Sequence, residues 1–325
     1  MDTLQINNIL VPIDFSEASL NALDTAAAMA KRHDARLTLL HVINENLLSY
    51  GHFEVLPITS PVLEIMHDEA KDTVTQIAAG VKDKYGIEVI CDTTHGFVPP
   101  EICKYAEKAS ADLMVMGTHG ASGFREFFIG TNAFAVVKHA PCPVLTVPPN
   151  RKWESFSNIL FPVRNTVGAL EKYAFLRKII RCNNATLLVL GLPETSRPDS
   201  KNWVDDNVRR LKSDLSYDGV IWRTEMLEAT DRAASEVLET AAREETDLIA
   251  ITASLDYDIR DFFIGPYTQQ IVNHAKVPVL SIRPAPLPND ARQALQTIRA
   301  DYGPAVPGLS LPYTGAGMIS SVETP

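Results

Sequence analysis

Residues 8–42 read NILVPIDFSEASLNALDTAAAMAKRHDARLTLLHV, and the chain repeats their pattern further on. The stretch NILFPVRNTVGALEKYAFLRKIIRCNNATLLVLGL, residues 158–192, aligns with them without gaps at an offset of 150 residues. Residues 111–147 and 246–282 align in the same way at an offset of 135 residues. The repeat predicts two copies of one domain, the second shorter in its middle by about 15 residues.

Each copy alternates short apolar runs with patterns of helical spacing. In the first copy we expect strands at 9–13, 37–43, 88–93, 112–116 and 144–147, and helices at 17–32 (with Ser16 as N-cap), 62–85, 100–108 and 131–139. In the second copy we expect strands at 159–163, 186–190, 220–226, 248–252 and 279–282. Apolar strands separated by helices indicate parallel sheets covered on both faces. The expected fold class is therefore α/β, with two doubly wound five-stranded parallel sheets.

The composition suggests where the copies meet and end. The segment PPNRKWESF, residues 148–156, reads as a linker, so we expect one domain at 1–149 and another at 156–284. Residues 285–325 are rich in Pro, Gly, Ser and Thr, which predicts an extended or disordered C-terminal extension.

The chain has 325 residues, of which 46% are hydrophobic and 22% charged, as in soluble globular proteins. A net charge of −10 disfavours general binding to nucleic acid or to anionic membranes. The sequence shows no signal peptide, no apolar run long enough to span a membrane and no C-x-x-C pair among its four cysteines. We therefore expect a cytoplasmic protein with reduced thiols.

The loop GTHGASGFREFFIGTN, residues 117–132, follows the fourth strand of the first copy. Glycines allow close approach of the backbone to a ligand, and the helix that begins near Gly130 and Thr131 offers unpaired N–H groups. The Thr131 hydroxyl could cap this helix and also donate to a phosphate oxygen. The alternative is a bare turn, because glycines after a strand are common and the Walker A pattern is absent.

The spacing Gly117-x2-Gly120-x9-Gly130-Thr131 resembles the signature G-x2-G-x9-G-[S/T] of universal stress proteins. The strings ILVPIDFSEAS and HAPCPVLTV are also similar to that family, and the resemblance covers about residues 5–284. It implies an adenine-nucleotide-alpha-hydrolase-like fold with strand order 3-2-1-4-5 in each copy. It also implies a tandem pseudo-dimer paired through the fifth strands, with a homodimer and an unidentified protein partner as further expectations.

The resemblance implies an ATP site in the first copy. Asp14 would contact the nucleoside, although it could instead begin the following helix as a cap. The other implied roles are adenine contacts by Pro12, Ile13 and Val42, wrapping of the ribose and phosphates by Met116, Gly117, His119 and Gly120, and phosphate binding by Gly130, Thr131 and Asn132. Mg²⁺ would accompany ATP, since it prefers phosphate oxygens and water.

The second copy departs from the signature. Asp14 is replaced by Arg164, and Gly117, Gly120 and Thr131 are replaced by Thr252, Leu255 and Pro266. We expect that this copy does not bind ATP in the family manner, and that Arg164 either fills the site or binds a different anion.

The expected function is a stress-response regulatory protein that binds Mg-ATP in its first copy as a nucleotide-dependent switch. The alternatives are a nucleotide-independent partner-binding scaffold and a weak ATPase. No catalytic set and no H-x3-H or HExxH spacing is present, so enzymatic activity stays open and would be slow hydrolysis at most.

Overall fold

The computed structural model of the chain describes residues 5–44, 60–118, 129–149, 151–166, 168–253, 255–256, 263–264 and 266–284. The first half contains β1 (Asn8–Ile13), α1 (Glu17–His33), β2 (Arg36–Asn44), α2 (Ser60–Tyr85), β3 (Val89–Gly96), α3 (Val98–Lys108), β4 (Leu113–Gly117), α4 (Thr131–His139) and β5 (Val144–Val147). The second half contains β6 (Asn158–Arg164), α5 (Lys172–Asn183), β7 (Thr186–Leu192), α6 (Ser200–Tyr217), β8 (Ile221–Met226), α7 (Ala233–Arg243), β9 (Leu248–Thr252), β10 (Leu255–Asp256), β11 (Phe263–Ile264), α8 (Pro266–His274) and β12 (Val279–Ile282).

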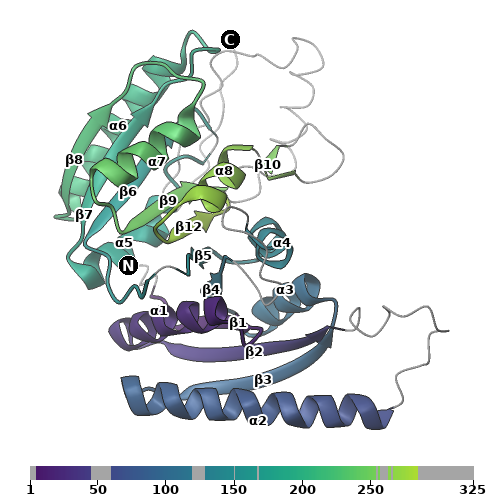
Figure 1. The fold of residues 1–325 in the computed structure, drawn as a ribbon. Coiled ribbons are helices and arrows are strands. Elements are labelled where there is room, and N and C mark those ends of the chain that lie inside the picture. Colours follow the sequence, from purple (N-terminus) through teal and green to yellow (C-terminus); the bar gives the residue numbers. More distant parts are fainter. Residues whose placement is uncertain are drawn as a thin grey trace, which may run out of the picture. The chain divides into compact units, whose positions relative to one another are not determined.

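The two expected sheets are in fact one ten-stranded sheet, with the order β3-β2-β1-β4-β5-β12-β9-β6-β7-β8 (Figure 1). Within each half the order is 3-2-1-4-5, and the pairs inside each half are parallel. The halves join where β5 and β12 pair antiparallel, with Leu280 opposite Leu145. The Thr146 hydroxyl also donates to the Val279 carbonyl at 3.2 Å. The expectation of two sheets was wrong, because each fifth strand offers the other a free edge, but the expected pairing through the fifth strands is confirmed.

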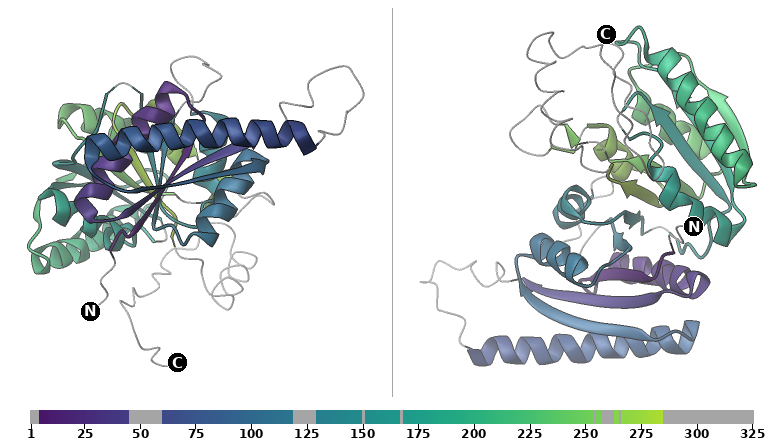
Figure 2. Two further views of the ribbon diagram at one scale, coloured as in Figure 1. Left: turned by 90° about the horizontal axis from the view of Figure 1, so that it is seen from below. Right: turned by 180° about the vertical axis from the view of Figure 1, so that it is seen from behind.

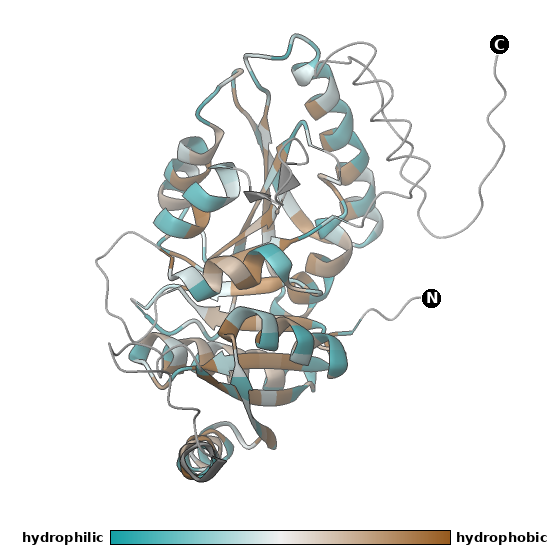
Figure 3. Ribbon diagram, turned by 90° about the vertical axis from the view of Figure 1, so that its right-hand side faces the viewer, coloured by the Kyte–Doolittle hydropathy of each residue, from teal (hydrophilic) through white to brown (hydrophobic). Residues whose placement is uncertain are grey.

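Helices cover both faces of the sheet, as the apolar strands predicted (Figure 2). One hydrophobic cluster joins the strands to α1, α2, α5 and α6 and runs through both halves. On the opposite face, α3 and α4 pack on the first half and α7 and α8 on the second. Hydrophobic residues accordingly concentrate along the strands, and the outer sides of the helices are mostly hydrophilic (Figure 3).

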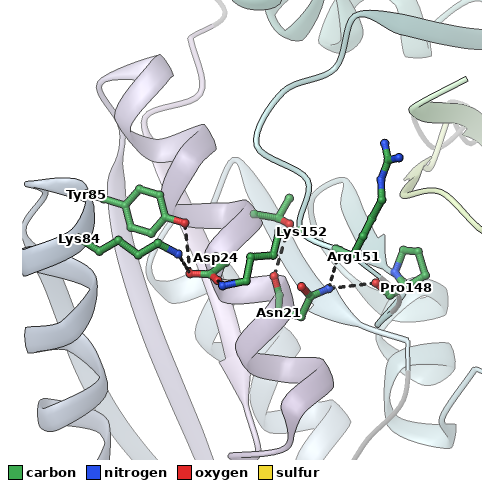
Figure 4. Close-up of polar contacts among 8 residues, drawn as sticks. Asn21, Asp24, Lys84, Tyr85, Pro148, Arg151 and Lys152 are labelled. Atoms are coloured by element: carbon green, nitrogen blue, oxygen red, sulfur yellow. Dashed lines mark hydrogen bonds and ion pairs between the residues drawn. The ribbon is translucent and has the colours of Figure 1, made fainter.

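The expected linker is packed against the first half rather than extended from it. The Nδ2 group of Asn21, on α1, donates to the carbonyls of Pro148 and Arg151 at 3.0 and 3.1 Å (Figure 4). Trp153 and Phe156 are buried in the core. The division into domains at 149 and 156 stays a prediction, because the chain up to Pro284 forms one compact unit.

An acidic residue of α1 adds an ionic anchor to the same segment. Asp24 accepts from Lys152 at 2.5 Å, from Lys84 at 2.8 Å and from the Tyr85 hydroxyl at 3.2 Å (Figure 4). Burial opposes ionisation, but the hydrogen bonds from Lys152 and Lys84 together lower the pKa of Asp24. Asp24 thus ties the segment to both α1 and α2.

No helix among the described residues is long and apolar enough to cross a membrane. The expected C-terminal extension, residues 285–325, lies outside the described residues.

Candidate functional site

The candidate site lies where the central strands of the first half end. The strand β1 lies between β2 and β4, and all three run parallel, so their carboxyl ends meet at one edge of the sheet (Figure 1). Asp14 directly follows β1, Val42 lies near the end of β2, and Met116 and Gly117 end β4. The structure therefore brings these four predicted positions to a common edge.

Asp14 is exposed and does not itself cap α1. The cap is Ser16, as predicted, whose Oγ accepts from the Ser19 amide at 3.2 Å. The Oδ1 atom of Asp14 accepts from the Ser16 amide at 3.1 Å and from the Ser16 hydroxyl at 2.5 Å. Asp14 therefore orients the capping serine, and its carboxylate stands at the solvent side of the strand end.

The predicted adenine contacts are mostly core residues. The side chains of Pro12, Ile13 and Val42 are buried, and those of Ile13 and Val42 belong to the clusters on opposite faces of the sheet. These residues can offer a ligand their backbone and a hydrophobic floor, but no exposed side chain.

Two aromatic side chains at this edge were not predicted. The Nδ1 atom of His41 lies 2.9 Å from the Ile13 carbonyl, and the His41 ring stacks on Phe15 with centroids 4.3 Å apart. A carbonyl can only accept, so the Nδ1 atom of His41 carries the hydrogen. Phe15 holds a φ of 64°, which is uncommon for a bulky residue. The only sequence signal was a histidine at the end of an apolar strand.

The packing of β4 against α1 requires a glycine at position 117. A Cβ atom at this position would lie 2.7 Å from the carbonyl oxygen of Ala18, in the first turn of α1. We expected this glycine to permit close approach of a ligand, and the structure adds a tight contact between β4 and α1.

The start of α4 differs from prediction in its cap. Gly130 is the N-cap, with a φ of −57°, and its amide donates to the Thr118 carbonyl at 2.7 Å. Thr131 is the first helical residue, and the N-cap Gly130 has no side chain, so the expected Thr131 cap was wrong. Thr131 and Asn132 are both exposed. Within the described part of the chain, no side chain is seen to cap the first-turn N–H groups of α4.

His119 and Gly120 lie outside the described residues, so their predicted roles stay predictions. Among the residues that the structure describes, no group of three or more His, Cys, Asp or Glu could hold a metal ion.

In the second half, Arg164 fills the position of Asp14. Its guanidinium donates to Glu194 at 3.0 Å and lies 4.0 Å from the ring centre of Tyr267, which replaces Asn132. Arg164 thus packs against protein side chains at this edge, and its binding of a different anion stays a prediction.

Lys172, the first residue of α5, also occupies this edge of the second half. Its side chain is 2% exposed, and its Nζ donates to the carbonyls of Pro162 and Ala169 at 2.9 and 2.6 Å and to the Thr252 hydroxyl at 3.3 Å. Burial, with a smaller contribution from the charge of Arg164, lowers the pKa of Lys172 to about 7. Three acceptors match the three donors of an ammonium group, so this network satisfies itself.

The helix start explains how the second half accommodates these side chains. The helix α5 begins at Lys172, whereas by alignment with Glu17 it would begin at residue 167. Residues 168–171 form turns in place of the first helical turn, and Thr252 stands where the first half carries Gly117. After β9, the strands β10 and β11 pair antiparallel, with Leu255 opposite Ile264.

Comparisons with known proteins point to one family. A profile described as the universal stress protein family matches residues 5–148. Universal stress protein MJ0531 of Methanocaldococcus jannaschii is 30% identical over 148 residues, which cover 44% of this chain and 83% of that protein. Universal stress protein A homolog 1 of Coxiella burnetii is 32% identical over 144 residues, which cover 44% of this chain and 97% of that protein.

A solved structure extends the likeness beyond the matched profile. The crystal structure of a universal stress protein from Archaeoglobus fulgidus covers 86% of this chain and 99% of its own, with a TM-score of 0.69 and 16% identity. At this identity the likeness concerns the fold alone, and it reaches into both halves.

Proposed function

Because the chain belongs to the universal stress protein family, we propose that its first half binds ATP with Mg²⁺ and acts as a nucleotide-dependent switch in a stress response. The spacing Gly117-x2-Gly120-x9-Gly130-Thr131 carries this proposal. Its support is the strand-end edge, where Asp14 is exposed and the first turn of α4 has no side-chain cap. An uncapped helix N-terminus favours a phosphate group through its N–H groups and its dipole.

The chain's own residues would share the binding. Asp14 would accept from the ribose hydroxyls, and the amides of Gly130, Thr131 and Asn132 would donate to phosphate oxygens. When bound, Mg²⁺ would neutralise phosphate charge and would be held chiefly by phosphate oxygens and water.

We further propose that the second half is a second domain of the same family that has lost nucleotide binding. The repeated strand order supports a shared origin. The buried Lys172 and the Arg164–Glu194 ion pair support the loss, because they occupy the equivalent edge. The expected stoichiometry is therefore one ATP per chain.

The test is calorimetric titration of ATP into the wild-type protein and into the double variant Asp14→Ala, Gly130→Asp. We expect one site in the wild type and none in the variant, where a carboxylate faces the phosphates. A matched variant of the second half, Arg164→Ala, should bind ATP as the wild type does. Equal affinity in the wild type and the double variant would refute the site, and absence of binding to the wild type would favour the scaffold alternative.

A further inference from the structure

Side chains of the second half hold α4 of the first half at both of its ends. The Oδ1 atom of Asn273, on α8, accepts from the Ile129 amide at 3.0 Å, just before the N-cap Gly130. Arg283, directly after β12, donates to the carbonyl of Ala140, the C-cap of α4, at 3.0 Å. An amide N–H can only donate, so the Asn273 atom that faces it is the oxygen.

Apolar packing supports the same contact. Ile129 packs against the hydrophobic cluster around α3 and α4 and also against the cluster around α7 and α8. The antiparallel pair of β5 and β12 lies beside these helices (Figure 1). Ile129, the residue before the N-cap of α4, is therefore held by contacts with both halves.

The first half does not carry, at the aligned positions, the side chains that would make the same two hydrogen bonds to α8. In the alignment at offset 135, Asn273 corresponds to Lys138 and Arg283 corresponds to Pro148. An ammonium group cannot accept from an N–H, and proline has no side-chain donor. The two equivalent hydrogen bonds to α8 therefore cannot form from these aligned positions.

We infer that Asn273 is a positioning residue for the nucleotide site of the other half, with Arg283 supporting the far end of α4. The inference rests on the proposed function, because it takes the first turn of α4 as the phosphate site. It gives the second half a role that does not require a ligand of its own. Asn273 acts through the Ile129 amide, which sets the direction of the N–H groups that follow.

The test compares ATP with adenosine, because only ATP reaches α4. In Asn273→Ala we expect the Kd for ATP to rise about tenfold, as the loss of one part-buried hydrogen bond predicts, while the Kd for adenosine stays unchanged. The matched control is Gln269→Ala, which removes an exposed amide side chain from the same helix. Arg283→Met should raise the Kd for ATP less than Asn273→Ala does, because its contact is at the far end of α4.

Two results would overturn the inference: an unchanged Kd for ATP in Asn273→Ala, or an equal loss of ATP and adenosine affinity, which indicates general damage. If the wild type binds no ATP, the proposed function fails, and hydrogen exchange then decides the positioning role. Faster exchange at Ile129 and in the first turn of α4 of Asn273→Ala would uphold it, and unchanged exchange would refute it.

Discussion

The Nζ atom of Lys172 lies 3.3 Å from Oγ1 of Thr252, at positions where the first half carries Ala22 and Gly117. The same strand-end edge thus exists in two forms within one chain. In one form the helix begins directly after the strand and packs on a glycine. In the other the helix begins later, and the buried Lys172 side chain fills the space.

The buried lysine predicts an unusual dependence of stability on pH. The pKa of Lys172 is about 7 in the folded protein and 10.5 in its ordinary state, so between these values the unfolded chain binds a proton that the folded chain does not. Stability conferred by this group is therefore full above pH 10.5 and is lost as the pH falls toward 7, by about 1.4 kcal/mol per pH unit. Urea unfolding of the wild type and Lys172→Met at pH 7, 8 and 9 measures this slope.

The expected result is a difference in unfolding free energy between the two proteins that changes with pH, because the methionine side chain of the variant cannot titrate. Near pH 7 the variant should gain relative to the wild type, since its side chain carries no charge to bury. A difference that stays constant from pH 7 to pH 9 would show that Lys172 titrates normally.

His33, in the last turn of α1, predicts that stability also depends on pH in the acidic range. Burial, and then the charges of Arg32 and Lys178, lower the pKa of His33 from 6.5 to about 4. The unfolded chain takes up this proton first, so stability is full above pH 6.5 and is lost as the pH falls through 4. The midpoint of urea unfolding should drop more between pH 7.5 and pH 5 in the wild type than in His33→Gln; equal drops would contradict this.

Two glycine-to-alanine changes should have effects of opposite sign. Gly117→Ala places a Cβ atom 2.7 Å from the Ala18 carbonyl and should lower the unfolding free energy by about 1–3 kcal/mol. Gly80→Ala, inside α2, meets nothing within 4 Å and should raise it by about 0.5–1 kcal/mol through helix propensity. Chemical denaturation measures both, and a neutral Gly117→Ala would show that α1 moves away at little cost.

The Asp24 anchor predicts protection of the segment between the halves. In Asp24→Ala, Lys84 and Lys152 lose their shared carboxylate, so trypsin should cleave after Lys152 faster than in the wild type. The control is Glu88→Ala, which breaks the exposed Lys82–Glu88 pair and should leave the cleavage rate unchanged. Equal cleavage in the wild type and Asp24→Ala would mean that Asn21, Trp153 and Phe156 hold the segment without this carboxylate.

Strands that are short apolar runs could be predicted to the residue. The structure has β5, β9 and β12 with the predicted bounds, because the residues that flank each apolar run mark where the strand begins and ends. The hairpin of β10 and β11 was missed, since its strands have two residues each and no measurable period. The join of the two halves could not be read from the apolar runs, but the family resemblance implied pairing through the fifth strands, and β5 and β12 do pair.

The candidate site could be predicted in its positions but not in its contacts. The strand order brings Asp14, Val42 and Gly117 to one edge, and the Gly130 amide donates to the Thr118 carbonyl just after β4. Lys172 was missed because it lies among charged residues at the start of a helix, where a lysine normally faces water. Only the delayed start of α5 brings it inside.

The antiparallel pair of β5 and β12 also decides how the halves respond to dilution. If two separate chains met through these edges, their association would weaken as the protein became scarce. Here both edges belong to one polypeptide, so each half meets the other at an effective concentration fixed by the connecting segment. The arrangement that presents Asn273 to Ile129 is therefore independent of expression level.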